Sequence, residues 1–416
     1  MNTDKHRWKS NAFFVFFSLT LPLGAQTAPP KSWIDADTGH RVVRLTDEPG
    51  SASLYFNQNG YTADGKKLIY TSPAGIATFD LATHETRTVV AGRVRIIVAG
   101  RKSQNVYYIK SGTVYATDVD TLATREIAKA PARNGVSVPT VNANETLLAG
   151  TYIENEGPDY NAGRTQDPQP QSLAQPANKG QMMEQRLAAR LPMAMFTMST
   201  KTGEVKVIHR ATDWLNHLEF SPTDPGLLMF CHEGPWHKVE RIWTIRTDGS
   251  QITKVHTRTM AMEIFGHEFW SHDGKTIWYD LQTPRGEDFW VAGYNVENGA
   301  RTWYHLQRNE WSIHFNVTAD GKLFCGDGGD PGQVAKAPDG EWIYLFRPEL
   351  IPNRGITDSQ LVTPGVFRAE KLVNMSKHQY KLEPNVSFTP DQKWVVFRSN
   401  MFGPTFVFAV EVEKGK

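Results

Sequence analysis

Histidines and acidic residues gather in five short stretches of this 416-residue chain. Each stretch precedes a turn rich in Asp, Pro or Gly, and they are "LNHLEFSP" (215–222), "FCHEGPWHKVERIW" (230–243), "GHEFWSHDG" (266–274), "WSIHFNVTADG" (311–321) and "KHQYKLEPNVSFTPD" (377–391). An imidazole titrates near neutral pH and therefore suits proton transfer. One histidine alone, such as His267, is most simply a buried residue bonded to a neighbour. Five such stretches at equivalent places favour a functional site.

The elements that must position these stretches are short strands that recur in seven units. Each unit has a turn with Asp or Asn, an apolar strand and a second strand that ends in a polar turn, and the units span residues 62–86, 104–124, 142–205, 221–252, 271–301, 318–350 and 389–412. Period-two alternation and recurrence at roughly 40–50 residues predict an all-β fold, a seven-bladed β-propeller. Residues just ahead of the innermost strands of a propeller converge on the mouth of its central channel. We therefore expect the five stretches to share one cavity.

Residues 33–46, "WIDADTGHRVVRLT", have the composition of an outer strand with no inner strand before it. We expect this N-terminal strand to complete the last blade and close the ring, which removes an exposed sheet edge. Two insertions, about 154–192 and 351–380, interrupt the repeat, and the first ends in a short helical stretch, "GQMMEQRLAARLP" (180–192). We expect both to be loops that lie over one face of the propeller.

Composition and charge describe an exported globular protein. Three basic residues precede the apolar run "AFFVFFSLTLPLGA", which is too short to span a bilayer, so residues 1–28 are predicted to be a signal peptide and 29–416 the mature, periplasmic or secreted domain. The chain carries 45 basic and 44 acidic residues without a basic stripe, which argues against a nucleic-acid partner. Two cysteines, Cys231 and Cys325, are too few for a disulfide framework and are predicted to be core residues.

At the histidine-bearing stretches the chain resembles the oligogalacturonate lyases, a family of seven-bladed propeller polysaccharide lyases. The motifs "WLNHLEFSP", "CHEGP", "GHEFW", "IHFNVTADG" and "VSFTPD" occur in the family's order and at near-family spacing. "CHEGP" followed 35 residues later by "HEFW" is a specific combination, whereas "TADGK" alone is common in exported propellers. The resemblance covers most of the mature chain.

The resemblance implies β-elimination on a uronate, in which a base removes the proton at C5 and the 4-O-linked sugar leaves. It places that base on His267 and the arginine that attends the substrate carboxylate on Arg241. His217 and His232 match further cavity histidines. Trp236, like Trp311, stands beside the histidines and is a candidate to stack on a sugar face.

The resemblance also implies a divalent metal ion that acts on the carboxylate. Its first histidine ligand matches His314. Where the family has two histidines separated by a proline, this chain has Glu383-Pro384-Asn385, and Tyr380 stands in place of a glutamine ligand and is a candidate to bind substrate. Glu383 and Asn385 offer oxygen atoms. With His314 and His378 they form the predicted ligand set, which favours Mn²⁺, or alternatively Ca²⁺.

Three functions remain open at this point. The first is cleavage of short oligogalacturonides, the second is a lyase for another uronate-containing glycan, which the Glu-Pro-Asn departure motivates, and the third is a non-catalytic exported binding module. Glu268 is interpreted as a supporting residue. Arg186 and Arg190 on the inserted helix are interpreted as a solvated face, with a grip on a second uronate as the alternative.

Overall fold

The computed structural model describes residues 29–154, 178–332, 338–356, 358 and 360–415. The predicted signal peptide lies outside the described residues, as does the part of the first predicted insertion from 155 to 177. Contacts divide the chain into residues 1–30 and a compact unit of residues 31–416, and all of the described strands and helices belong to this second unit. None of the described helices is both long and apolar enough to cross a membrane.

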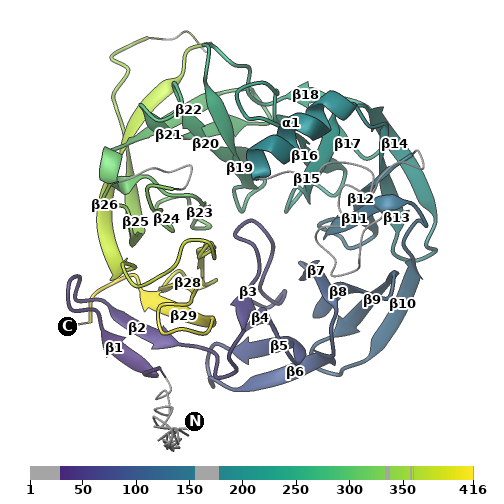
Figure 1. The fold of residues 1–416 in the computed structure, drawn as a ribbon, viewed down its shortest axis with the longest axis horizontal. Coiled ribbons are helices and arrows are strands. Elements are labelled where there is room, and N and C mark those ends of the chain that lie inside the picture. Colours follow the sequence, from purple (N-terminus) through teal and green to yellow (C-terminus); the bar gives the residue numbers. More distant parts are fainter. Residues whose placement is uncertain (1–28, 155–177, 333–337, 357, 359, 416) are drawn as a thin grey trace, which may run out of the picture. The chain divides into compact units, whose positions relative to one another are not determined.

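Strands in the described part of the chain form six hydrogen-bonded sheets, which surround a common centre as the blades of a propeller (Figure 1). In the first four blades, antiparallel strands follow one another in chain order from the centre outward. Blades one and two contain β3 (Ala52–Ser53), β4 (Lys67–Ser72), β5 (Gly75–Asp80), β6 (Thr86–Ala91), and β7 (Arg95–Ala99), β8 (Asn105–Lys110), β9 (Thr113–Asp118), β10 (Thr124–Lys129). Blades three and four contain β11 (Asn134–Val141), β12 (Leu147–Ile153), β13 (Met193–Ser199), β14 (Val205–Ala211), and β15 (Trp214–Phe220), β16 (Leu227–Glu233), β17 (Ile242–Arg246), β18 (Thr253–Lys254).

The fifth and sixth blades form one eight-stranded sheet because their outermost strands pair in parallel. The strands are β19 (Ile264–Trp270), β20 (Thr276–Gln282), β21 (Phe289–Asn295), β22 (Arg301–Leu306), and β23 (Phe315–Val317), β24 (Phe324–Gly326), β25 (Trp342–Leu350), β26 (Thr363–Asn374). The predicted insertion 351–380 is therefore wrong in its central part. Residues 363–374 are β26, which pairs along the whole of β25 and with β22.

The seventh blade closes the ring as predicted. It combines β27 (Ser387–Phe388), β28 (Trp394–Ser399) and β29 (Phe406–Glu411) with β2 (Arg41–Arg44) and β1 (Ser32–Ile34) from the other end of the chain. Val42 and Val43 of β2 pair with Val410 and Ala409 of β29. The N-terminal strand thus supplies the outer strand that residues 387–411 lack, and the seven-bladed propeller is confirmed.

Side-chain chemistry explains the repeated inner turns. In four blades a hydroxyl donates to the carboxylate two residues later at 2.6–2.7 Å, in the pairs Thr62–Asp64, Ser271–Asp273, Thr318–Asp320 and Thr389–Asp391. A left-handed residue follows in the same turn, usually glycine, as at Gly65, Gly274 and Gly321. These turns are the strongest sequence signal of the repeat.

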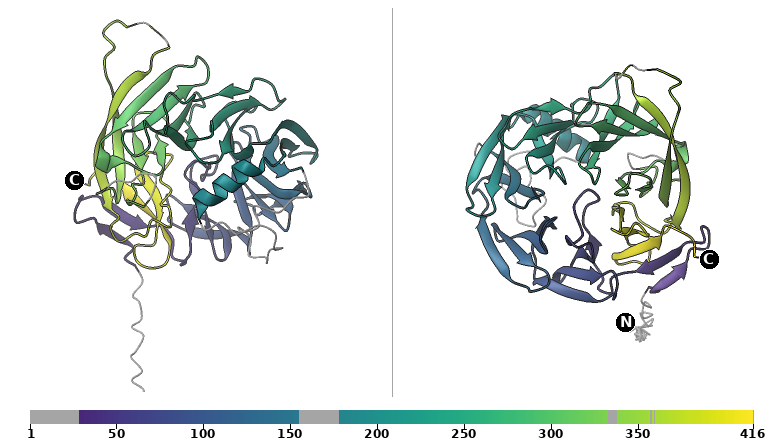
Figure 2. Two further views of the ribbon diagram at one scale, coloured as in Figure 1. Left: turned by 45° about the horizontal axis from the view of Figure 1, so that its top comes forward. Right: turned by 180° about the vertical axis from the view of Figure 1, so that it is seen from behind.

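The predicted helical stretch is confirmed as α1 (Lys179–Ala189), which begins at Asn178, whose Oδ1 accepts a hydrogen bond from the Gln181 amide at 2.9 Å. The interpretation of Arg186 as solvated is wrong. Its side chain is 3% exposed and its guanidinium lies 4.0 Å from the centre of the Trp214 ring. Arg190 does lie at the surface, where it pairs with Asp213. The helix therefore packs on the fourth blade (Figure 2).

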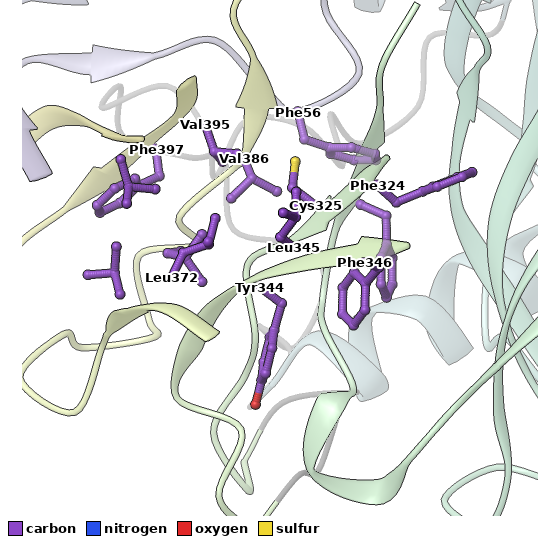
Figure 3. Close-up of a cluster of buried hydrophobic side chains, with 14 of the residues drawn as sticks. Phe56, Phe324, Cys325, Tyr344, Leu345, Phe346, Leu372, Val386, Val395 and Phe397 are labelled. Carbon is purple, nitrogen blue, oxygen red and sulfur yellow. The ribbon is translucent and has the colours of Figure 1, made fainter. Parts of the chain in front are cut away.

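Apolar side chains fill the spaces between blades. The largest cluster spans the last three blades and includes Phe324, Leu345 and Phe397 (Figure 3). Both cysteines are fully buried and unpaired, which supports their interpretation as core residues. Trp311 is 1% exposed and belongs to the same cluster, so it is a core residue and not a sugar-stacking one. This rigid packing fixes where the inner strands end.

Candidate active site

Two histidines of the inner strands have the same unusual backbone conformation. His217 on β15 and His267 on β19 have φ values of +47° and +46°. At each one the antiparallel register with the next strand shifts, between Asn216 and Glu219 in one blade and between Gly266 and Phe269 in the other. Left-handed non-glycine residues in bulges are strained and concentrate at functional sites. Both imidazoles line the same small recess at the centre of the propeller.

The recess opens into a larger cavity. The recess has a volume of about 40 Å³ and the cavity about 440 Å³. Residues that line both come from the first, third, fourth and seventh blades or the segments that join them, and they are Tyr55, Asn57, Lys179, His217, Glu233 and Glu383. The recess is large enough for a small polar group or a few water molecules, whereas the cavity has the size of a small-molecule site.

A buried carboxylate lies beside His267. Nδ1 of His267 lies 3.4 Å from Oδ2 of Asp280, whose side chain is 1% exposed. Asp280 lies on β20 directly opposite Gly266, the residue before the histidine. Burial by itself lowers the pKa of His267, but the charge of Asp280, together with that of Glu383, outweighs it and the pKa is raised. The edge of Trp236 packs on the same imidazole, with ring centres 5.0 Å apart.

Arg241 forms the opposite wall of the recess. It is 2% exposed, and its Nη1 donates to Oε1 of Glu233 at 2.6 Å. Its guanidinium lies over the ring of Trp236 at 4.5 Å, and Nη2 is 4.0 Å from Glu268. His217 bonds the other oxygen of Glu233 at 2.9 Å. Burial alone raises the pKa of Glu233, but Arg241 and His217 hold it well below its usual range. Glu233 is therefore ionised and fixes both groups.

A second buried histidine, His314, lies beside His267, with ring centres 4.8 Å apart. Its Nδ1 bonds Oδ2 of Asp327 at 2.8 Å, and the hydroxyl of Tyr55 lies 3.1 Å from its Nε2. This carboxylate–histidine arrangement is the one that commonly supports a metal ligand. Glu383 is also near, with Oε2 3.9 Å from Nε2.

The other two predicted metal ligands, His378 and Asn385, do not group with His314 and Glu383. The ring nitrogens of His378 lie 2.9 Å from Ser399 Oγ and 2.6 Å from the Leu382 carbonyl oxygen. The side chain of Asn385 accepts from the Phe56 amide and donates to the Glu383 carbonyl. In the described ranges no three His, Cys, Asp or Glu side chains group as metal ligands. The predicted four-ligand set therefore does not fit a resident ion, because local hydrogen bonds occupy two of its members.

Two predicted substrate-binding residues also face elsewhere. His232 alternates with Glu233 on β16, so its ring turns from the recess and packs against Trp243 with ring centres 5.2 Å apart. Tyr380 is 2% exposed and donates its hydroxyl proton to the Asp327 carbonyl at 3.1 Å. Tyr380 therefore stabilises the backbone at Asp327, the residue whose carboxylate bonds His314. His217 and Trp236, in contrast, do line the recess.

Sequence reasoning missed four residues that contact the candidate base, arginine or metal ligand, namely Tyr55, Glu233, Asp280 and Asp327. Glu233 had a usable signal, since it is next to His232 in "CHEGP" and strand alternation puts one of the two inward. Asp280 lies on β20, which pairs with β19, and Asp327 directly follows β24, which pairs with β23. Strand pairing therefore brings each carboxylate next to its histidine. Tyr55 comes from the loop after β3, which reaches the centre of the ring (Figure 1).

Comparisons with known proteins agree on one family. The description of the matching family model is oligogalacturonate lyase, and the match covers residues 27–415. The oligogalacturonide lyase of Pectobacterium atrosepticum is 25% identical over 395 residues, and the oligogalacturonate lyase of Dickeya dadantii is 24% identical over 398. Each alignment spans 91% of this chain and 95% of the relative.

Solved structures show the same fold. An oligogalacturonate lyase in complex with manganese superposes with a TM-score of 0.73 at 23% identity, over 92% of this chain and 96% of that one. The oligogalacturonate lyase of Vibrio parahaemolyticus gives 0.72 at the same identity and coverage. From the match over nearly the whole chain, the protein belongs to the oligogalacturonate lyase family and is an oligosaccharide lyase.

Proposed function

We propose that the chain is an exported lyase that cleaves short oligogalacturonides by β-elimination and leaves a 4,5-unsaturated uronate. The observation that carries the proposal is the strained bulge at His267, which turns an imidazole backed by Asp280 into a recess walled by Arg241. The printed names of the relatives support oligogalacturonides as the substrate class.

The elimination needs a base close to a carboxylate-binding group. The base removes the proton at C5, the electrons of that bond form the C4–C5 double bond, and the C4–O bond breaks. The leaving oxygen keeps the bonding electrons and takes up a proton. Asp280 favours the tautomer of His267 with its proton on Nδ1, which leaves the lone pair on Nε2 as the proton acceptor.

Arg241 is proposed to bind the C6 carboxylate next to the reacting carbon. Negative charge grows on this carboxylate as C5 loses its proton, so a fixed cation stabilises the transition state more than the ground state. Glu233 and Trp236 hold the guanidinium in place before substrate arrives. Lys179 of α1 also lines the recess and adds a second positive charge nearby.

Cavity size supports short substrates. The 440 Å³ cavity lies beneath α1, which contributes Lys179, Met182 and Met183 to its wall. A covered space of this volume suits a small ligand better than a polymer. Export is part of the proposal because of the charged-then-apolar N-terminus.

A lyase for another uronate glycan is the second candidate. Glu383 lies at the recess with its side chain 36% exposed, and a carboxylate there alters which sugar hydroxyls are accepted. A panel of uronate oligosaccharides, assayed by the ultraviolet absorbance of the unsaturated product, separates the two candidates. Digalacturonate and trigalacturonate should be the best substrates.

Replacing the base should abolish turnover. We expect His267→Ala to fold normally and to lose about 10²–10⁴-fold in rate, because general-base catalysis contributes that much. The measurement is the rate of absorbance increase with digalacturonate. His232→Ala is the matched control, since His232 faces away from the recess, and it should remain active. A His267→Ala protein with more than about a tenth of wild-type turnover would be incompatible with this assignment.

Lysine should not replace Arg241. Arg241→Lys keeps the charge but loses the planar fork that bonds Glu233 and reaches the recess, so we expect kcat/KM to fall by about 10²-fold. Melting temperature should be measured in parallel to separate catalysis from folding. Full activity of the lysine variant would reduce the role of Arg241 to long-range charge.

The acid limb of the pH profile should depend on Asp280. The base must be neutral to act, so kcat/KM rises with pH through the pKa of His267, which Asp280 raises. Asp280→Asn removes the negative charge and should move this limb to lower pH, while the maximum falls by about 10²-fold through lost orientation. If the limb does not move, Asp280 does not act through His267.

Chelation should have little effect on turnover. A solved relative is described as a manganese complex, but the hydrogen bonds of His378 and Asn385 leave the predicted ligand set incomplete here. We expect protein dialysed against a chelator, shown metal-free by elemental analysis, to retain most of its activity. A loss of more than about tenfold that Mn²⁺ or Ca²⁺ restores would contradict this expectation.

A further inference from the structure

Arg101 is a charged side chain that has no partner among the residues that the structure describes. It follows β7 and lines both the 440 Å³ cavity and a second one, of about 330 Å³, and residues of the β3–β4 loop line both cavities as well. Among the described residues, no hydrogen bond and no carboxylate within 4.0 Å engages its guanidinium. Most arginines in a protein interior are paired, because an unpaired buried charge is costly.

Glu219 is the nearest candidate for a structural partner, and it does not satisfy Arg101. It lines both cavities, but the two groups are farther apart than an ion pair, and Oε2 of Glu219 is buried without any hydrogen bond. Burial raises the pKa of Glu219 well above its usual range and lowers that of Arg101. Glu219 therefore does not neutralise the positive charge of Arg101, and an added anion would stabilise the guanidinium.

The backbone around Arg101 is held rigidly. Gln58 donates to the Ile97 carbonyl at 3.0 Å, and Asn59 donates to the carbonyls of Ala99 and Gly100 at 3.1 and 3.3 Å. These bonds tie the central loop to the end of β7. An arginine on a fixed backbone at the edge of a cavity is preorganised for a ligand.

The cavity leads from Arg101 to the recess. Asn57 lines the recess and both cavities, and Lys179 lines the recess and the larger cavity. The recess is too small for a sugar ring, so a uronate whose C5 faces His267 must place its ring, and any sugar joined to it, in the larger cavity. Every sugar of an oligogalacturonide carries a carboxylate. The recess cation Arg241 is shared with Glu233, which leaves the second carboxylate to another cation.

We propose that Arg101 binds the carboxylate of the uronate that adjoins the reacting one, and so forms a second uronate subsite in the depth of the propeller. This proposal rests on the proposed function. A guanidinium fits a carboxylate with two parallel hydrogen bonds, which gives both affinity and orientation. The subsite makes the protein select substrates with two successive free carboxylates.

The test is a binding cycle between the arginine and the carboxylate. Digalacturonate and each of its two mono-methyl esters are titrated by calorimetry into His267→Ala protein, which keeps the ligand intact, and into the same protein with Arg101→Gln. We expect one ester to bind roughly 10- to 100-fold more weakly than digalacturonate when Arg101 is present, and equally well when it is replaced. The other ester should lose the same affinity in both proteins.

Arg93→Gln is the matched control, because Arg93 is an exposed arginine just ahead of β7 on the same blade. It should leave all three affinities unchanged. Arg101→Lys guards against a folding defect and should keep part of the coupling. Absence of coupling with either ester, or equal weakening of all three ligands by Arg101→Gln, would overturn the subsite. Failure of wild-type protein to form unsaturated product while this coupling persists would refute the lyase proposal and leave the subsite standing.

Discussion

The hydrogen bonds between β2 and β29 close a ring in which three of the seven inner strands, those of the first, sixth and seventh blades, have no more than three residues. β3 and β27 have two residues each and β23 has three. A single short hairpin is marginal in water, so each blade depends on packing against both neighbours. Blades one and seven meet only if the ring is closed. At that junction the Phe56 amide donates to Asn385 Oδ1 at 3.3 Å and Tyr55 reaches His314. Closure is therefore a condition for the site itself.

Within the closed ring, local departures from regular strands aim the reactive groups. A regular strand alternates its side chains between two faces, and in a propeller both faces pack on neighbouring blades. A bulge with a left-handed residue breaks this alternation and turns one side chain along the blade edge, toward the channel. His217, His267 and Asn385 all have positive φ ahead of an inner turn. Such strain costs on the order of 1–3 kcal/mol for each residue. The buried packing of the blades offsets that cost.

The sequence predicts the ring better than the site because the two depend on different kinds of information. Repeated turns and period-two alternation are local, so seven blades and their closure by residues 33–46 follow from them. β26 was mistaken for a loop because an outer strand is exposed on one side and carries charges such as Arg368, Glu370 and Lys371 in place of a clear apolar pattern.

In the site, His267 and Arg241 were found through motifs, and both line the recess. His232 was misplaced by one residue because a bare motif does not say which of two neighbours faces inward. His378 and Asn385 were misplaced as ligands because their hydrogen-bond partners lie in loops whose paths the sequence does not reveal.

Three carboxylates line the recess, those of Glu233, Glu268 and Glu383, against the two cations Lys179 and Arg241, yet the recess is proposed to receive an anion. Three buried carboxylates in the recess or next to its histidines already have partners: Glu233 bonds Arg241 and His217, Asp327 bonds His314, and Asp280 lies 3.4 Å from Nδ1 of His267. Glu268 is 2% exposed and lies 4.0 Å from Arg241, and no group in the described ranges forms a hydrogen bond with either of its carboxylate oxygens. Under the proposed mechanism a substrate carboxylate shares Arg241 with two glutamates, so we expect its ground-state affinity in the recess to be weak. That weakness favours catalysis, since the same cation gains most when the carboxylate takes on the charge of the departing proton. Affinity then has to come from cations away from the reacting carbon, and in the described part of the chain Arg101 and Lys179 line the larger cavity without an ion-pair partner.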